Sequence, residues 1–169
     1  MVSVFLLVAG LLGSAHALDV QRSVEGEVVV VSAVLPHTAA EVRALLAQHE
    51  ATMRMGKETR RVETRPLPNG CTELKVVSRG FGRDMRYTAE RCRTANGFRS
   101  KMVASEDFDA HDIWWTFAPA EAGTEVTIRV DVRPRVMVPH FLIQRFVSRA
   151  LSETLTKMNQ VLERGHLAP

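Results

Sequence analysis

The sequence predicts an α+β domain in which one long C-terminal helix covers an antiparallel sheet. Residues 139–164 contain no proline or glycine after Pro139, and their apolar residues recur at steps of three and four, as on one face of a helix. Such a helix would be roughly 38 Å long. Residues 124–133 alternate apolar and polar side chains, which is typical of a strand with one face in water. The apolar face of the sheet has to be buried against another element, and only the long helix is large enough.

The first seventeen residues resemble an export signal. An uncharged apolar run ends in Ala15-His16-Ala17, a small-x-small cleavage pattern, although no Lys or Arg precedes the run. The run is shorter than the about 20 residues that a membrane span needs. We expect a signal peptide at 1–17 and one domain at 18–169, exported to the periplasm or secreted. An uncleaved anchor and a buried N-terminal segment are the alternatives.

The first half of the domain begins with a strand at 25–35, where four consecutive valines favour extended backbone. Thr38 and Glu41 then form a capping-box pattern that starts a helix reaching about Gln48. Residues 49–56 are ambiguous between a loop and a second short helix.

Six more strands follow, separated by turn signals such as Asn96-Gly97. Their expected ranges are 57–67, 71–78, 84–93, 98–105, 109–118 and 124–133. The connections between them are of hairpin type, so the sheet, of about seven strands in all, is expected to be antiparallel.

The two cysteines are predicted to face each other across a hairpin. If the turn is centred on Phe81-Gly82, Arg79 faces Asp84 and Cys71 faces Cys92. This register places apolar residues on one face and charged residues on the other, as a half-buried hairpin requires. Directly opposed residues are close enough for a disulfide, which an exported protein would form. Two reduced cysteines are the alternative; a metal or redox role is not favoured, because the spacing is not C-x-x-C.

Three features stand together: the element order, the Trp115-x-Phe117-x-Pro119 turn leading into Gly123-Thr124-x-Val126, and the Val138-Pro139-x-Phe141-Leu142 entry to the last helix. In these features the chain resembles the START-like (SRPBCC, helix-grip) superfamily, and its polyketide cyclase and coenzyme Q-binding branch in particular. The resemblance covers about residues 25–165. It implies a helix-grip fold, a curved antiparallel sheet wrapped around the C-terminal helix, with an apolar cavity between them. Many members bind lipids, sterols, quinones or polyketides. Residues 51–57 are less apolar than the second short helix of the family, which affects the expected mouth of the cavity.

If that cavity exists, its lining is expected to come from the inward faces of the sheet and the last helix. The candidates are Met85, Tyr87, Arg91, Met102, Trp115, Phe117, Val126, Ile128 and Val130 from the sheet, and Phe146, Ala150, Leu151, Leu155 and Met158 from the helix. Tyr87 would bond a ligand's polar end or a group within the core. Arg91 would pair with an anionic headgroup or extend to the rim. Trp115 would line the cavity or pack in the core.

Catalytic and metal motifs are absent from the sequence. There is no phosphate-binding glycine loop, H-E-x-x-H or G-x-S-x-G. Asp109-x-His111-Asp112 is the only local acid–histidine cluster, and we interpret it as a solvated loop start rather than a metal or acid–base site. We therefore expect no catalytic residue, metal or cofactor.

The basic residues are spread along the chain and not interleaved with aromatic ones, so nucleic acid is not an expected partner. The net charge of +3 leaves open a transient contact with an anionic membrane surface.

The leading hypothesis is an exported, monomeric protein that binds, carries or sequesters a hydrophobic small molecule, such as a lipid, a sterol-like compound or a quinone. Such a role needs only shape, apolar surface and one or two polar anchors. Two alternatives stay open: a cyclase or aromatase-type enzyme on the same fold, and an interaction module whose core is filled. We favour a binding protein over an enzyme.

Overall fold

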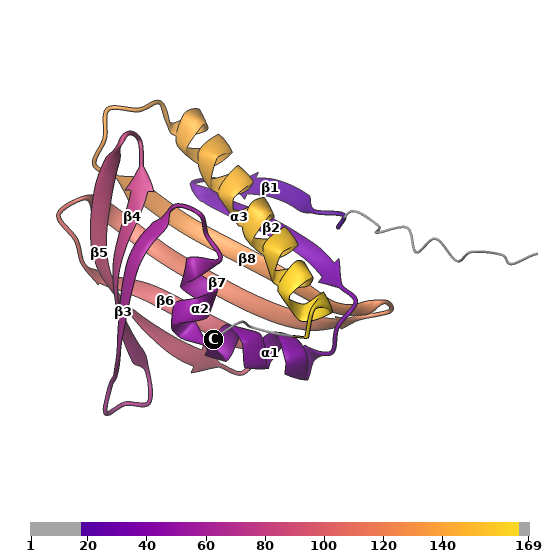
Figure 1. Cartoon of the computed structure of the whole chain (residues 1–169). Helices are drawn as coiled ribbons and strands as arrows, with labels where there is room; N and C mark the ends of the chain where they lie inside the picture. Colours follow the sequence, from indigo (N-terminus) through magenta and orange to yellow (C-terminus); the bar gives the residue numbers. More distant parts are fainter. Residues whose placement is uncertain (1–17, 166–169) are drawn as a thin grey trace, which may run out of the picture.

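The structure is a computed structural model, and it describes residues 18–165. Eight strands form one antiparallel sheet in the order β1-β2-β8-β7-β6-β5-β4-β3. In chain order the elements are β1 (Gln21–Glu25), β2 (Val28–Leu35), α1 (Ala39–Ala47), α2 (His49–Arg54), β3 (Thr59–Pro66), β4 (Thr72–Gly80), β5 (Arg83–Thr94), β6 (Gly97–Ala104), β7 (Phe108–Ala120), β8 (Gly123–Pro134) and α3 (His140–Glu163). The sheet curves around α3, while α1 and α2 lie across one end (Figure 1). The predicted α+β, helix-grip class is confirmed.

One strand, β1, was not predicted from the sequence. The range assigned to a single strand at 25–35 contains the end of β1, a turn at Gly26 with a φ of 64°, and β2. All five residues of β1 are exposed and only Val24 is apolar, so the segment carries no alternating pattern. Pairing with the valine-rich β2, from Gln21–Ser32 to Glu25–Val28, makes it a strand. The sheet therefore has eight strands, not about seven.

The helix signals in the sequence were sufficient to place α1 and α3. At the start of α1, the Glu41 N–H donates to the Thr38 hydroxyl at 3.3 Å, and the Thr38 N–H donates to the Glu41 carboxylate at 2.8 Å. This is the predicted capping box. The helix α3 begins one residue after Pro139 and ends one residue before Arg164. The ambiguous segment 49–56 contains the short helix α2.

The β4–β5 hairpin has the predicted register. Arg79 pairs with Asp84, and Thr72 pairs with Arg91. The next pair outward is Cys71 and Cys92, whose Cα atoms are 4.4 Å apart and whose sulfurs form a disulfide. The predicted disulfide is therefore present. It closes the end of the hairpin that lies opposite the Phe81-Gly82 turn.

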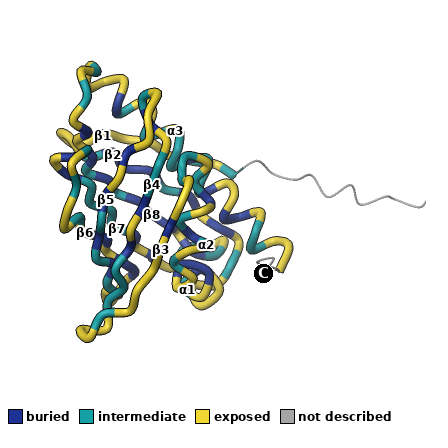
Figure 2. Tube along the Cα trace, turned by 60° about the vertical axis from the view of Figure 1, so that its left-hand side comes forward, coloured by how far each residue is buried: buried dark blue, intermediate teal, exposed yellow. Residues whose placement is uncertain are grey.

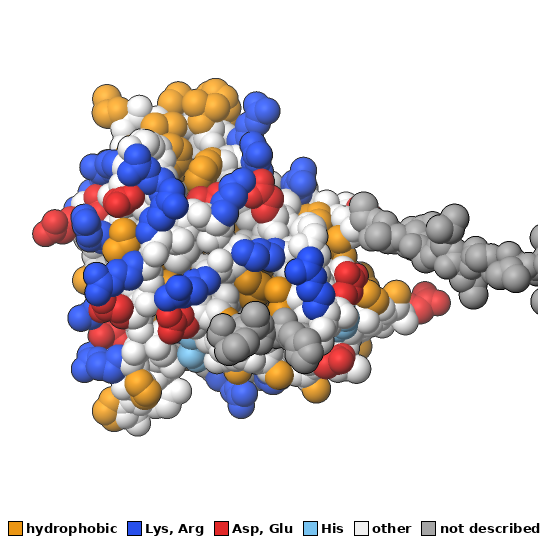
Figure 3. Space-filling view, viewed as in Figure 1, with side chains coloured by type: hydrophobic (Ala, Val, Ile, Leu, Met, Phe, Trp, Pro, Cys, Tyr) orange, Lys and Arg blue, Asp and Glu red, His pale blue; other side chains and the backbone are white. Residues whose placement is uncertain are grey.

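Exposed and buried residues lie in separate parts of the molecule. Figure 2 shows exposed residues on the hairpin tips, on β3 and on the outer side of α1, and buried residues along the central strands. Charged side chains of both signs cover the face seen in Figure 3, and hydrophobic ones gather at its top, over the β8–α3 loop and the start of α3. Within residues 18–165, no helix has the length and apolar character that crossing a bilayer requires.

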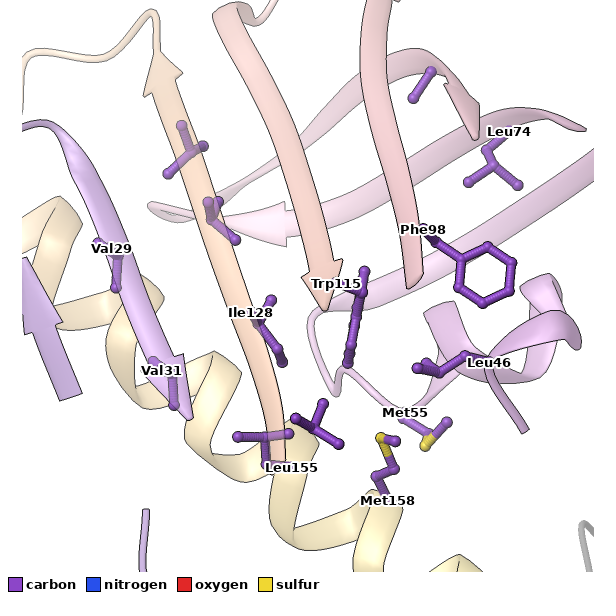
Figure 4. Close-up of a cluster of buried hydrophobic side chains, with 14 of the residues drawn as sticks. Val29, Val31, Leu46, Met55, Leu74, Phe98, Trp115, Ile128, Leu155 and Met158 are labelled. Carbon is purple, nitrogen blue, oxygen red and sulfur yellow. The ribbon is translucent and has the colours of Figure 1, made fainter. Parts of the chain in front are cut away.

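The packed core occupies the end of the molecule where α1, α2 and the second half of α3 meet the sheet. Leu155 and Met158 of α3 are fully buried. Figure 4 shows Met158 beside Met55 and Leu155 near Ile128. Because α1 and α2 supply side chains on this side, the space between helix and sheet is filled here. Any open space has to lie toward the start of α3.

Candidate ligand cavity

A cavity of about 180 Å³ lies between the sheet and the first half of α3. The sheet contributes residues of β4, β5, β6, β7 and β8, while α3 contributes its inward face from Ile143 to Thr154. A further side is formed by the end of α2 and the segment before β3, including Met53, Gly56 and Glu58. Among these lining residues, Arg79 at the end of β4 and Phe146 on α3 are exposed, so the cavity opens between the β4–β5 turn and α3. A larger hollow of about 570 Å³ on the outside of β4 and β5 is lined by charged residues such as Arg61 and Lys75, which suits an apolar ligand poorly.

The mouth is bounded by two phenylalanines. The ring centroids of Phe81, at the β4–β5 turn, and Phe146, on α3, are 5.3 Å apart. Phe81 has a φ of 49°, a conformation that bulky residues rarely adopt. The two formally charged residues among those that line the cavity within residues 18–165, Glu58 and Arg79, are also at this outer end. The Arg79 guanidinium is half exposed and pairs with Asp84 at 3.2 Å.

The inner wall carries uncharged polar groups among apolar ones. Tyr87 of β5 and His111 of β7 stack with centroids 4.0 Å apart and planes 21° from parallel, and Phe108 meets both rings edge-on. Burial raises the pKa of the Tyr87 phenol, an effect opposed by the charge of Arg91. Burial lowers the pKa of His111 to about 4, and the residue's own backbone and Asp112 oppose this effect only in part. Both rings are therefore neutral at pH 7.

These polar groups have unused bonding capacity. Among residues 18–165, no group bonds the Tyr87 hydroxyl, although the residue is only 6% exposed, and the buried Nδ1 of His111 lacks a partner. Ser100 of β6 is 4% exposed and also lines the cavity. Buried polar groups in folded proteins are normally hydrogen-bonded. Three of them on one wall of a cavity form an arrangement that a bound molecule could satisfy.

The structure brings together half of the residues proposed from the sequence. Those that line the cavity are Met85, Tyr87, Trp115, Val130, Phe146, Ala150 and Leu151. The others lie elsewhere: Phe117, Val126, Ile128, Leu155 and Met158 in the packed core, and Met102 partly buried on β6. The reason is that α1 and α2 fill the space beside the second half of α3, whereas nothing fills it beside the first half.

Arg91 does not extend to the rim. It is 1% exposed and is not among the residues that line the cavity. Its Nη2 donates to the carbonyl of Leu46 at 3.2 Å, near the C-terminal end of α1, and its guanidinium lies 4.8 Å from the centre of the Phe98 ring. A helix C-terminus and an aromatic face both favour a cation. Burial lowers the pKa of Arg91 to about 10, so it keeps its charge at pH 7.

His111 was assigned wrongly to a solvated loop start. Residues 109–112 lie within β7, and the acid–histidine cluster is divided between different partners. Asp109 pairs with Arg135 at 2.7 Å, and the Asp112 carboxylate accepts from the Met102 N–H at 2.9 Å. His111 instead faces the cavity. Strand parity could have placed it there, because it alternates in step with Ile113 and Trp115.

A family model described as polyketide cyclase / dehydrase and lipid transport matches residues 35–159, which is most of the chain. The chain belongs to this family. The resemblance noted from the sequence is thereby confirmed. No curated protein matches the sequence significantly.

Several solved structures share the fold of this chain at low sequence identity. A START superfamily protein from Mycobacterium smegmatis is 13% identical with a TM-score of 0.72, and the match covers 83% of this chain and all of that one. The Zhui aromatase/cyclase from Streptomyces sp. R1128 is 12% identical with a TM-score of 0.66, over 88% and 98%. A STAR-related lipid transfer protein from Xanthomonas axonopodis is 18% identical with a TM-score of 0.63, over 88% and 95%. At these identities the likeness shows the fold alone.

Proposed function

We propose that the protein binds a hydrophobic small molecule in the cavity between the sheet and α3, and carries or sequesters it. The observation that supports this most directly is the cavity itself: its walls are mainly apolar, and its formally charged lining residues are at the mouth. Ligand sites in proteins have this composition, apolar walls with a few placed polar groups. The names of two solved relatives, a lipid transfer protein and an aromatase/cyclase, are consistent with ligands of this kind.

Native mass spectrometry of the unreduced protein, purified from an exporting host, tests the proposal. We expect a bound mass that organic extraction releases, and its identity gives the ligand class. The same spectrum reports whether the protein is a monomer and whether the chain begins at Leu18, as cleavage of the proposed signal peptide requires. The disulfide is compatible with export to an oxidising compartment. A bare protein after gentle purification, together with no binding of added hydrophobic probes, would contradict the carrier function.

The surface beside the mouth supports a transient contact with a membrane as part of this function. Met137, Phe141, Leu142 and Phe146 are exposed apolar residues of the β8–α3 loop and α3; we call them the mouth patch. Figure 3 shows hydrophobic side chains gathered in this region with basic ones beside them. The first turn of α3 contains no acidic residue, and Arg145 is exposed on the same helix. Exposed apolar residues beside a basic one, with no acidic residue in the first turn of α3, suit a surface that contacts anionic lipid headgroups.

An enzyme of the cyclase or aromatase type is a second candidate. The observation that favours it is the neutral Tyr87–His111 pair, which lines the cavity and could donate or accept a proton. Tyr87→Phe and His111→Phe discriminate the two functions. In an enzyme these variants would lose turnover while still binding ligand, whereas in a carrier they would change affinity only.

A further inference from the structure

The uncharged polar groups on the inner wall of the cavity come from three neighbouring strands. Tyr87 is on β5, Ser100 on β6 and His111 on β7. The pairing of β6 with β7 ends at Ser100 and Ile113, and beyond this point the Tyr87 and His111 rings stack directly on each other. The sheet thus presents one polar wall, formed by Tyr87, Ser100 and His111, within otherwise apolar surroundings.

The polar wall is suited to an uncharged group. The nearest formal charges among the lining residues are Glu58 and the ion-paired Arg79 at the mouth, and Arg91 lies outside the lining with its Nη2 on the Leu46 carbonyl. Arg91 lies opposite Ser100 in the β5–β6 pairing, but its guanidinium does not line the cavity and is engaged by the Leu46 carbonyl and the Phe98 ring. A carboxylate or phosphate placed against the polar wall would therefore be buried without a counter-charge in contact with it, which is costly. A hydroxyl or carbonyl oxygen would instead supply the bond that the Tyr87 hydroxyl lacks.

The size of the cavity limits what lies against the polar wall. Its volume is about 180 Å³, and an apolar cavity of about 150 Å³ holds one benzene molecule. The inner space therefore accommodates one six-membered ring, and Tyr87, Phe108 and Trp115 offer aromatic surface to it. Anything longer has to leave by the mouth, between Phe81 and Phe146.

We propose that the ligand enters ring first: its inner end is a single uncharged ring carrying a hydroxyl or carbonyl oxygen, which hydrogen-bonds to Tyr87, and its apolar chain leaves between Phe81 and Phe146. The inference rests on the proposed binding function and names the ligand class for that cavity. It assigns Tyr87 as the residue that determines specificity. It excludes fatty acids and phospholipids with a buried headgroup.

Three matched probes test the inference on the full mature protein at pH 7.5: butylbenzene, 4-butylphenol and 4-butylbenzoate. Dissociation constants are measured by calorimetry or by tryptophan fluorescence, since Trp115 lines the cavity. We expect 4-butylphenol to bind about 5- to 10-fold more tightly than butylbenzene, the factor that one hydrogen bond provides. We expect 4-butylbenzoate to bind at least about tenfold more weakly than the phenol, because its charge is buried unpaired.

The variant Tyr87→Phe removes only the hydroxyl. It should reduce the preference for the phenol to about twofold or less, with the affinity for butylbenzene unchanged. Thr116→Val is the matched control, because it removes a hydroxyl from the exposed side of β7, and it should keep the full preference. Circular dichroism of each variant checks the fold.

Several results would overturn the inference. Equal binding of phenol and butylbenzene, an unchanged preference in Tyr87→Phe, or tightest binding of the benzoate would each show that the polar wall does not select an uncharged oxygen. In these cases a probe still binds, so the proposed function stands. If none of the three probes binds, the ring-first site is wrong, and the native mass spectrum decides separately whether a different ligand occupies the cavity.

Discussion

At the scale of single residues, the fold keeps His111 neutral. It stacks on Tyr87 and contacts Phe108, and burial is the main cause of its lowered pKa. In the unfolded chain the same imidazole regains an ordinary pKa near 6.5. Between these two values the unfolded state binds a proton that the folded state does not. Folding stability must therefore fall as pH decreases through this window.

We predict a loss of stability of about 3 kcal/mol from this residue between pH 6.5 and pH 4, at roughly 1.4 kcal/mol per pH unit. Above pH 6.5 the contribution is constant, because the ring is neutral in both states. Urea unfolding at several pH values measures it, with His111→Phe as the comparison. The pKa of His49 is also lowered, chiefly by burial, and that residue is retained in the variant. Parallel stability curves for the two proteins would contradict the prediction.

At the scale of elements, the β4–β5 hairpin is cross-linked by a disulfide at one end and borders the cavity at the other. Cys71 and Cys92 are joined at the end away from the turn, and Phe81 at the turn contacts Phe146 of α3. The disulfide fixes the strands in the register that directs Met85 and Tyr87 into the cavity. The turn end, which borders the mouth, meets α3 through side chains such as Phe81 and Phe146.

We predict that Cys71→Ala/Cys92→Ala lowers the free energy of unfolding by about 3 kcal/mol, because the bridge closes a loop of 21 residues in the unfolded chain. Chemical denaturation with and without a reducing agent measures the effect. The reduced wild-type protein should approach the double variant, and the variant should be insensitive to reductant. A wild-type protein that unfolds identically in both conditions would refute a stabilising bridge.

The mouth patch is the second feature at this scale. We predict that Met137→Ser/Phe141→Ser lowers binding to phosphatidylcholine–phosphatidylglycerol vesicles by about tenfold or more, since each side chain loses apolar burial of about 1.5–3 kcal/mol. Co-sedimentation with vesicles measures it. Val103→Ser is the control, because Val103 is equally an exposed apolar residue but lies on β6. Equal losses in the control and the patch variant would remove the proposed membrane contact.

On the scale of the whole molecule, the packing along α3 is uneven. Its second half packs with Leu46 of α1 and with Met55, which directly follows α2, while its first half lies over the cavity. Ala150 is the small residue of α3 that lines this space. Its size is one reason that the cavity stays open.

We predict that Ala150→Phe fills the cavity and removes most of the mass that co-purifies with the wild-type protein, at a cost in stability of about 1–3 kcal/mol from overpacking. Native mass spectrometry of the folded variant measures occupancy. Gln160→Phe places the same side chain on the exposed side of α3 and should leave occupancy unchanged. A folded Ala150→Phe protein with full occupancy would place the ligand elsewhere.

Several features of the fold could be predicted from local patterns in the sequence. The spacing of apolar residues in 139–164 specified α3, the capping box specified the start of α1, and the turn between Phe81 and Gly82 specified the hairpin register and therefore the disulfide. Alternation also placed Tyr87 and Trp115 on the inward face. Such patterns report which side of an element faces inward, because they depend only on neighbouring residues.

Which inward residues line a cavity and which pack against other side chains depends on how distant segments come together. Leu155 and Ala150 follow the same helical pattern, yet one is packed in the core and the other lines open space. The difference comes from α1 and α2, which are distant in sequence and cover only one end of α3. The polar strand β1 and the burial of Arg91 against Leu46 have the same origin. Each depends on which distant residues pack beside a given one, and the periodicity of the sequence does not report these neighbours.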